Sequence, residues 1–411
     1  MCIVLLTTSH PKYPLIILDN RDEYILRPTS RPHWWKTRTE SDPSKEVEIL
    51  SSVDLQRPEH GTWLGITKDG NFAVLTNYRE MDTQDTNHPV HTKRSRGGMV
   101  TAWLGADPAE PTEAFVRRML ESGDVKGVGG FSLICGKLRK AKLAKAKSLE
   151  PLAIISNRSE HLETIPWICG MFGKTYGLSN AIYVDPEEAT YAQGYVKSKD
   201  GLLPPTPPSP TIWPKIQTGA DMLSSLASSP DAADLPEEEL TESLFKILDT
   251  DKFPCESETE FEEGIPLLAN SIFIPAFGGK DRQEEMTAAR QKGTVSVANG
   301  GATTTTAEET LAIEARPDGG PANKLLWFQT GLYGTQRQTV ILVDWEGNVS
   351  YTERALYDEN GNPIRRGEGD MKFGFKIQGW DNEEDQQEEA DGKKDGEQPA
   401  EVKPKTNGYA M

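Results

Sequence analysis

The stretch that decides the fold is Cys2-Ile-Val-Leu-Leu-Thr-Thr8, a break at Ser9-His-Pro-Lys-Tyr-Pro14, and Leu15-Ile-Ile-Leu-Asp-Asn-Arg-Asp-Glu23. Two apolar, β-branched runs around a proline-rich break are typical of a β-hairpin with a longer loop. A turn centred on Pro11 and Lys12 would pair residues whose numbers sum to about 23. This register places Cys2 opposite Arg21 and beside Asp22, so the hairpin alone brings a thiol to an Arg-Asp pair.

The start of the chain could also carry chemistry. Removal of Met1, which a small second residue permits, would leave a free α-amine on Cys2. Its pKa of about 7.7–8.0 would let it act as a base toward the thiol. The Arg21 guanidinium would favour the thiolate, and the Asp22 carboxylate would hold that guanidinium. A small core cysteine and an ordinary surface ion pair explain the same residues, so spacing alone leaves both interpretations open.

The chain resembles the NRDE family, the transport and Golgi organisation protein 2 homologues, through landmarks that occur in one order. Asn20-Arg-Asp-Glu23 after Met1-Cys2 carries the family signature. A longer stretch than in the family pattern separates Ala181 from Trp213. The further matching blocks are Gly61-Thr-Trp-Leu-Gly-Ile-Thr67, Leu75-Thr-Asn-Tyr78, Gly130-Phe-Ser-Leu-Ile134, Tyr176-Gly-Leu-Ser-Asn-Ala181, Trp213-Pro-Lys-Ile216 and Tyr333-Gly-Thr-Gln-Arg-Gln-Thr-Val-Ile-Leu-Val-Asp344.

This resemblance implies an α+β fold, an αββα four-layer sandwich like that of N-terminal-nucleophile hydrolases. Periodicity alone indicates only hairpins, helices and further strands, in keeping with an α+β protein. On the family pattern Cys2 is the nucleophile and its own amine is the base. Arg21 and Asp22 would orient and polarise that pair.

The resemblance also implies three residues that would stabilise charge in an acyl-transfer reaction. Asn77 and Asn180, both at strand ends, are candidate oxyanion donors. Arg337 is a candidate second charged stabiliser for the oxyanion or the substrate carbonyl. Each residue has a plainer explanation, because asparagine is common in turns and an arginine at a strand start often forms an exposed ion pair.

The domain organisation expected from the sequence is a single domain over residues 1–380. Six prolines between residues 202 and 214 indicate an extended insertion, placed at about 198–212. A Gly/Thr/Ala/Glu-rich stretch predicts a disordered low-complexity insertion at about 279–322. An acidic run predicts a disordered tail over residues 381–411. The segment from Leu26 to Trp35 is expected to be a loop, serving either as a substrate rim or as a cap on the core.

Composition limits the partners of this chain. The formal net charge of −18 argues against nucleic acid and against electrostatic binding to anionic membranes. The four cysteines show no Cys-x-x-Cys spacing, so neither a zinc site nor a disulfide framework is expected. No apolar run approaches the roughly 18–20 residues of a transmembrane segment. We expect a cytoplasmic protein with peripheral association with the Golgi and, from the family, with mitochondria.

Two functions from different classes follow from the resemblance, whose members are described by Golgi organisation, protein secretion, lipid metabolism and haem mobilisation. One is an N-terminal-cysteine hydrolase of acyl amides or thioesters. The other is a non-catalytic carrier or chaperone that holds haem or an acyl lipid in the same cleft. No cofactor is expected to be required, and haem enters only as a ligand, because no histidine stands out as an axial ligand. A third interpretation is a scaffold that acts through its acidic tail.

Overall fold

The fold follows from a computed structural model, in which most of the chain is described. Side chains are not described for residues 190–211 or 294–298. The described residues are 2–39, 42–56, 59–77, 96–126, 129–141, 148–185, 190–191, 196–198, 201–203, 211–298 and 330–380.

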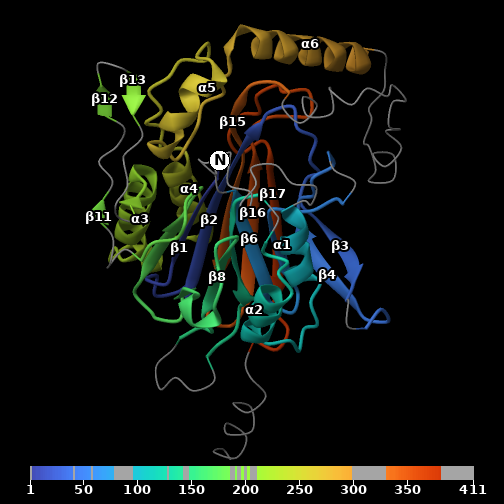
Figure 1. The fold of residues 1–411 in the computed structure, drawn as a ribbon, viewed down its shortest axis with the longest axis vertical. Coiled ribbons are helices and arrows are strands. Elements are labelled where there is room, and N and C mark those ends of the chain that lie inside the picture. The colour runs from blue at the N-terminus through green and yellow to red at the C-terminus, as the bar shows by residue number, and fades with distance from the viewer. Residues whose placement is uncertain are drawn as a thin grey trace, which may run out of the picture.

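Two antiparallel sheets form the centre of the molecule (Figure 1). The six-stranded sheet has the order β10 (Thr175–Leu178), β1 (Ile3–Thr7), β2 (Leu15–Tyr24), β15 (Tyr333–Val343), β16 (Asn348–Ala355) and β17 (Asp370–Lys376). The seven-stranded sheet has the order β3 (His33–Arg38), β4 (Glu46–Ser51), β5 (Leu64–Thr67), β6 (Asn71–Asn77), β7 (Phe131–Lys137), β8 (Leu152–Ser156) and β9 (Trp167–Ile168).

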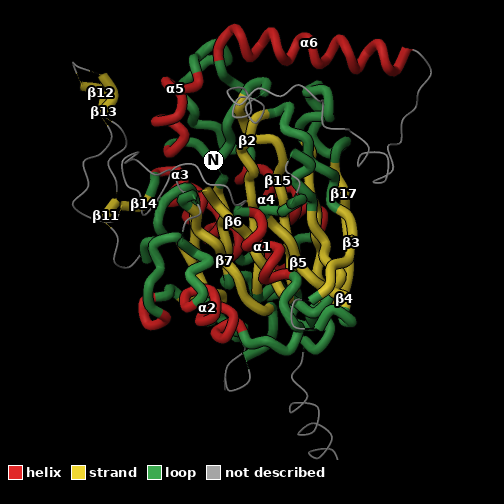
Figure 2. The backbone as a smooth tube through the Cα atoms, turned by 45° about the vertical axis from the view of Figure 1, so that its right-hand side comes forward, coloured by secondary structure: helices red, strands yellow, loops and turns green. Residues whose placement is uncertain are grey.

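Helices cover the outer face of each sheet, so the layers run helix, sheet, sheet, helix (Figures 1 and 2). On the six-stranded sheet lie α3 (Pro214–Ala227) and α4 (Glu237–Leu248), and on the seven-stranded sheet lie α1 (Gly97–Leu104) and α2 (Thr112–Glu121). The short α5 (Phe261–Gly264) and the long α6 (Gly279–Ala298) lie at one end of the sandwich (Figure 1). Single 3-10 turns occupy Leu162–Thr164, Ala232–Asp234 and Ile265–Ala269. This layering confirms the expected αββα sandwich of the α+β class.

The alternation of side chains along each strand explains the layers. In β1, Val4 and Leu6 face the core between the sheets, while Ile3 and Leu5 face the core under α3 and α4. Because neighbouring residues of a strand point to opposite faces, a strand that is covered on both sides must be apolar at every position. The opening apolar run of the chain therefore marks a central, doubly covered strand.

The first hairpin has the register that the sequence predicts. In β1 and β2, Ile3 pairs with Asn20 and Thr7 pairs with Ile16, so paired numbers sum to 23. Residue 2 precedes the first of these pairs, and continuation of the register places it opposite Arg21. The geometric prediction for the Cys2 end of the hairpin is confirmed.

A β-bulge interrupts the pairing of β2 with β15. Thr335 pairs with Asp22, but Arg337 pairs with Arg21, so Gln336 is the extra residue of β15. A bulge of this kind re-aims a side chain without ending the sheet. Here it keeps Thr335 on the helix-covered face with Asp22, and Arg337 on the inter-sheet face with Arg21.

Two expectations about irregular segments differ from the structure. Trp34 and Trp35 lie on the strand β3 rather than in a loop, and both pack against apolar cores, as the core-capping alternative requires. The stretch Gly279–Ala298 is the helix α6 rather than a disordered segment. Its Glu, Gln, Ala, Arg and Met side chains favour a helix, a local preference that overall composition conceals.

The remaining predicted insertions lie only partly within the described residues. Two short strands lie within the proline-rich region, namely β13 (Gly201–Leu203) and β14 (Thr211–Ile212), and two precede it, namely β11 (Thr190–Tyr191) and β12 (Val196–Ser198). The second half of the low-complexity region and the predicted tail over residues 381–411 fall outside the described part of the chain.

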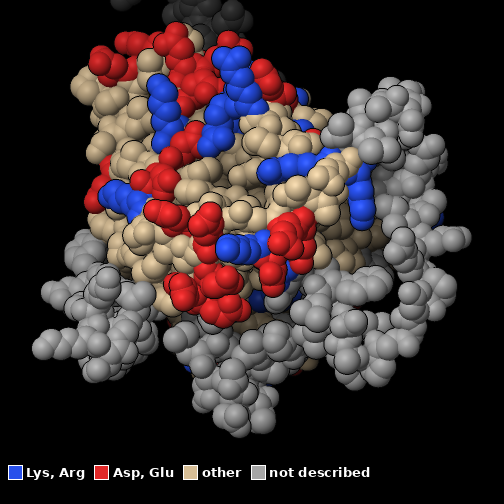
Figure 3. All heavy atoms as spheres, turned by 90° about the horizontal axis from the view of Figure 1, so that it is seen from above, with Lys and Arg blue, Asp and Glu red and all other residues tan. Residues whose placement is uncertain are grey.

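The described helices and surface can be compared with the expectation that the chain has no transmembrane segment and no nucleic-acid partner. None of these helices is both long and apolar enough to cross a bilayer. On the face seen from above, Lys and Arg side chains lie among Asp and Glu side chains rather than in one continuous basic stripe (Figure 3).

Candidate active site

Cys2 lies directly before β1, at the junction of the two sheets. Its side chain is 7% exposed. The backbone N–H of Asp22 donates a hydrogen bond to the thiol sulfur, and Ser179 Oγ donates to the Cys2 carbonyl at 2.7 Å. The hairpin and the turn after β10 therefore fix both ends of this residue.

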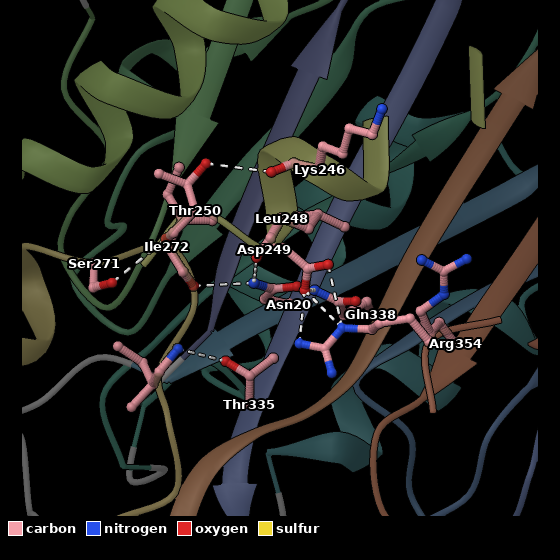
Figure 4. Close-up of polar contacts among 12 residues, drawn as sticks. Asn20, Lys246, Leu248, Asp249, Thr250, Ser271, Ile272, Thr335, Gln338 and Arg354 are labelled. Atoms are coloured by element: carbon pink, nitrogen blue, oxygen red, sulfur yellow. Dashed lines mark hydrogen bonds and ion pairs between the residues drawn. The ribbon is translucent and has the colours of Figure 1, made fainter. Parts of the chain in front are cut away.

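The side chains of the four residues Asn20-Arg-Asp-Glu23 on β2 point alternately to the two faces of the sheet. Asn20 points to the helix-covered face, where its amide donates to the carbonyls of Leu248 at 2.8 Å and Ile272 at 3.0 Å (Figure 4). It thus ties the end of α4 to the sheet. Glu23 accepts a bond of 3.0 Å from the backbone N–H of Tyr24 and pairs with Arg27 at 3.5 Å.

Arg21 points into the space between the sheets and is 5% exposed. Its guanidinium donates to Oε1 of the bulge residue Gln336 and lies 4.1 Å from the ring centroid of Trp63. Trp63 comes from the second sheet's side of the sandwich, so the guanidinium is held from both sheets. The favourable cation–π contact helps to offset its loss of water.

Asp22 points to the helix-covered face. Its Oδ1 accepts a hydrogen bond of 2.7 Å from Thr335 Oγ1, and its carbonyl accepts one of 3.0 Å from the Tyr333 hydroxyl. Burial raises the pKa of this carboxyl, while the Lys215 charge and the Thr335 hydrogen bond act in the opposite direction. Asp22 and Arg21 therefore do not form a simple surface ion pair, because they lie on opposite faces of β2.

Asn77 and Asn180 meet at the boundary between the sheets. Asn77 is the last residue of β6, and Asn180 follows β10 by two residues. The Asn180 side-chain amide donates to the Asn77 carbonyl. Thr76 Oγ1 donates to the Ser179 carbonyl at 2.9 Å, which closes the same junction. One N–H of the Asn180 amide is therefore engaged within the protein.

Arg337 is buried between the sheets, which excludes the exposed ion pair considered from the sequence. It donates to the Tyr357 carbonyl at 2.8 Å and lies 3.8 Å from a carboxylate oxygen of Glu353. Glu353 also accepts from Ser52 Oγ at 2.7 Å. Burial lowers the pKa of Arg337 to about 10, an effect that Glu353 opposes. Arg337 is paired with Arg21 across the strands and thus lies next to the site.

Lys215 is a site residue that sequence reasoning used only as a landmark. It is the second residue of α3 and is 0% exposed. Burial lowers the pKa of its amine, against the opposing charges of Asp22 and Cys2. The sequence offered one signal, the Trp213-Pro-Lys215 block at a helix start, but a lysine in a first helical turn is usually exposed.

The thiol of Cys2 is not activated in the chain that carries Met1. Burial, helped by the charges of Asp19 and Asp22, raises its pKa from 9.0 to about 11. The Asp22 backbone hydrogen bond favours the thiolate but is outweighed. The thiol is therefore protonated at neutral pH, and nucleophilic work would need an additional base.

Other parts of the described chain are weaker candidates for a functional site than the surroundings of Cys2. In the described part of the chain, no group of three or more His, Cys, Asp and Glu side chains is placed to hold a metal ion. A surface hollow of about 650 Å³ is lined by Cys255, Glu258, Leu267 and their neighbours. None of the six residues implied by the family pattern lines it.

The sequence comparisons agree with one another. The family model described as Transport and Golgi organisation 2 matches residues 1–358. The human Transport and Golgi organization protein 2 homolog is 26% identical over 368 residues, covering 88% of this chain and 95% of the relative. The mouse homolog is 24% identical over 366 residues, covering 88% and 95%. An uncharacterized protein of Saccharomyces cerevisiae is 22% identical over 388 residues, covering 92% and 100%.

Among solved structures, two mutant forms of the conjugated bile acid hydrolase from Clostridium perfringens match this chain. Both are 11% identical to it with a TM-score of 0.34. The first match covers 92% of both chains, and the second covers 91% of this chain and 97% of the other.

Proposed function

Because the chain belongs to the Transport and Golgi organisation 2 family, we propose that it serves Golgi organisation and protein secretion by hydrolysing an acyl amide or thioester at Cys2. The observation that carries the hydrolase proposal is the placement of the Cys2 thiol. It lies at the start of a central strand, accepts the Asp22 backbone N–H, and acts electrostatically on the buried Lys215 amine. Such a concentration of buried ionisable groups is typical of functional sites.

The proposed reaction begins after removal of Met1. The α-amine of Cys2 takes the thiol proton, and the thiolate attacks the acyl carbon to form a C–S bond. Asn77 and Asn180 stabilise the oxyanion, and the Arg21 and Arg337 charges act on it from the inter-sheet face. The leaving amine or thiol departs with the proton from the α-ammonium. Water then cleaves the acyl-thioester, with the α-amine again accepting a proton.

A panel of acyl amides and acyl thioesters tests this function. Intact mass first establishes whether the chain begins at Cys2. We expect hydrolysis by the chain that begins there, with an acyl adduct on Cys2, and its loss in Cys2→Ala. The matched control is Cys255→Ala, since Cys255 lies on a surface hollow apart from the site. Unchanged turnover in Cys2→Ala would contradict the proposal.

A second candidate is a carrier of an acyl lipid or of haem, and the raised thiol pKa favours it. A thiol with a pKa of about 11 is a protonated, weakly polar group at neutral pH. A carrier binds its ligand without needing this thiol. Palmitoyl-CoA and haem are therefore expected to bind saturably to Cys2→Ala as they do to the parent chain. If neither palmitoyl-CoA nor haem binds to the parent chain, the carrier is contradicted.

The proposed location is the cytoplasm, with peripheral association with the Golgi and mitochondria. Membership of the Transport and Golgi organisation 2 family supports the Golgi part of this proposal. Cell fractionation with a carbonate wash tests it, because a peripheral protein is released from the membrane pellet. Retention in the washed pellet would contradict it.

A further inference from the structure

The amine of Lys215 is buried without a hydrogen-bond acceptor. Its side chain is fully enclosed, and Nζ has no hydrogen-bond partner within the described residues. An ammonium group offers three donors, and buried donors are normally satisfied. A buried amine whose donors are all unused therefore calls for an acceptor that the described residues do not supply.

The fold holds this amine beside Cys2. Lys215 follows Pro214, the first residue of α3, and its Nζ lies 5.7 Å from the ring centroid of Trp213. The next residue, Ile216, packs with Ile3 in the core between α3 and the sheet. Since Ile3 adjoins Cys2 in the chain, the start of α3 is fixed against the strand that carries the thiol.

The charges around the amine also point to the site. Asp22 and Cys2 are the two ionisable groups whose charges act on Lys215. Asp22 Oδ1 already accepts the Thr335 hydroxyl at 2.7 Å. The amine thus interacts electrostatically with a carboxyl group that is held by another strand, but no hydrogen bond joins it to that carboxyl.

We propose that Lys215 is a ligand-binding residue whose amine holds an anionic oxygen, from a carboxylate or a phosphate, of a ligand with its acyl group at Cys2. This inference rests on the proposed hydrolase and narrows its substrates to anionic acyl compounds. Lysine suits this purpose because its ammonium is a compact point charge that binds an anion from any direction.

Two thiol reagents that differ in one charge test the proposal without a known substrate. Iodoacetate is anionic and iodoacetamide is neutral, and both alkylate the same thiolate. The ratio of their rates at Cys2 therefore does not depend on the thiol pKa. Peptide-resolved mass spectrometry gives this ratio at Cys2 and, in the same chain, at Cys255. We expect a higher ratio at Cys2 in the parent chain.

Variants at Lys215 isolate its contribution. Lys215→Met removes the charge at nearly constant length and is expected to lower the Cys2 ratio by about tenfold. Lys215→Arg keeps the charge and should retain most of the preference. Lys246→Met is the control, because Lys246 lies exposed on α4. An unchanged ratio in Lys215→Met overturns the proposal. If that variant does not fold, a parent-chain ratio at Cys2 no higher than at Cys255 overturns it.

Protection of Cys2 from iodoacetamide distinguishes the two sources of the anion. N-palmitoylglycine carries a carboxylate, palmitoyl-CoA carries phosphates, and N-palmitoylethanolamine is the neutral comparison. The anionic probe that fits should protect the parent chain better than the neutral probe, and Lys215→Met should remove the difference. None of these readouts needs turnover, so a Lys215-dependent preference without hydrolysis would refute the hydrolase and leave the anion site standing.

Discussion

The guanidinium of Arg21 donates a hydrogen bond to Oε1 of Gln336, the one residue by which β15 exceeds β2 at their bulge. Gln336 also donates from Nε2 to the carbonyl of Ile25 at 2.9 Å. The side-chain amide of the bulge residue therefore accepts a hydrogen bond from a buried cation and donates one to the backbone just after β2. The orientation of Arg21 depends on this irregularity as much as on its own strand.

Gln336→Ala should destabilise the protein by about 1–3 kcal/mol, because it leaves a buried guanidinium N–H and the Ile25 carbonyl without partners. Urea unfolding measures the loss. Gln378→Ala is the matched control, since Gln378 is exposed and bonds to Arg139 and Lys68 through its backbone, which the substitution keeps. Equal stability of the two variants would show that the Arg21 contact contributes little.

Asn20→Leu removes the amide that joins α4 and the segment at Ile272 to the sheet (Figure 4). Each of the two buried carbonyls would lose a donor, at a cost of about 1–3 kcal/mol. Thermal and urea unfolding report the sum. Asn348→Ala, which removes an exposed amide bonded to Asp344, should change stability far less. A similar loss in both variants would contradict the anchoring role of Asn20.

Glu353→Gln tests the buried charge cluster between the sheets. The amide keeps an oxygen for Ser52 but leaves Arg337 without its carboxylate. Removing one member of a buried ion pair costs about 3–5 kcal/mol, and adding Arg337→Met should recover part of it. The exposed Glu359→Gln is the control. A double variant no more stable than the single one would show that the two charges do not interact.

The alkylation rate of Cys2 should keep rising with pH in the chain that retains Met1. Its pKa is about 11, so the thiolate fraction and the rate with iodoacetamide grow about tenfold per pH unit up to pH 10. Free cysteine, with a pKa of about 8.5, levels off earlier and serves as the reference. A plateau for Cys2 below pH 9 would contradict the burial of this thiol.

The same shift has a consequence for stability. The folded pKa lies above the ordinary value of 9.0, so folding favours the protonated thiol. This contribution is complete below pH 9 and is lost as the pH rises from 9 toward 11. Cys2→Ala should therefore lose less stability than the parent chain over that interval, as urea unfolding at several pH values would show.

Local sequence predicted the parts of the fold that local interactions decide. The hairpin register followed from the proline-rich break between two apolar runs. The burial of Lys215 could not be predicted, because it depends on how α3 packs over β1. The bulge at Gln336 arises from pairing with a strand more than three hundred residues away, which no local pattern encodes.

The six family-derived residues form two adjoining groups, since Cys2 lies opposite Arg21 and acts electrostatically on it. Cys2, Asn77 and Asn180 meet through the turn that contains Ser179, while Arg21 and Arg337 lie side by side between the sheets. Asp22 connects the first group to the helix-covered face. The order of residues in the sequence could not reveal this arrangement. Arg21 and Asp22 are adjacent in the family signature, but alternation along β2 turns their side chains to opposite faces of the sheet. Their catalytic roles stay predictions.

The extra residue in β15 also means that the number of residues in this strand decides which side chains reach the site. Thr335 reaches Asp22 on one face while Arg337 accompanies Arg21 on the other only because one residue is inserted between the two pairs. Deleting it would rotate one half of the strand, so that either Thr335 or Arg337 would face the wrong layer. An insertion in a loop leaves the faces of the strands unchanged. Deletion of Gln336 would instead turn a side chain of the site to the opposite face of the sheet.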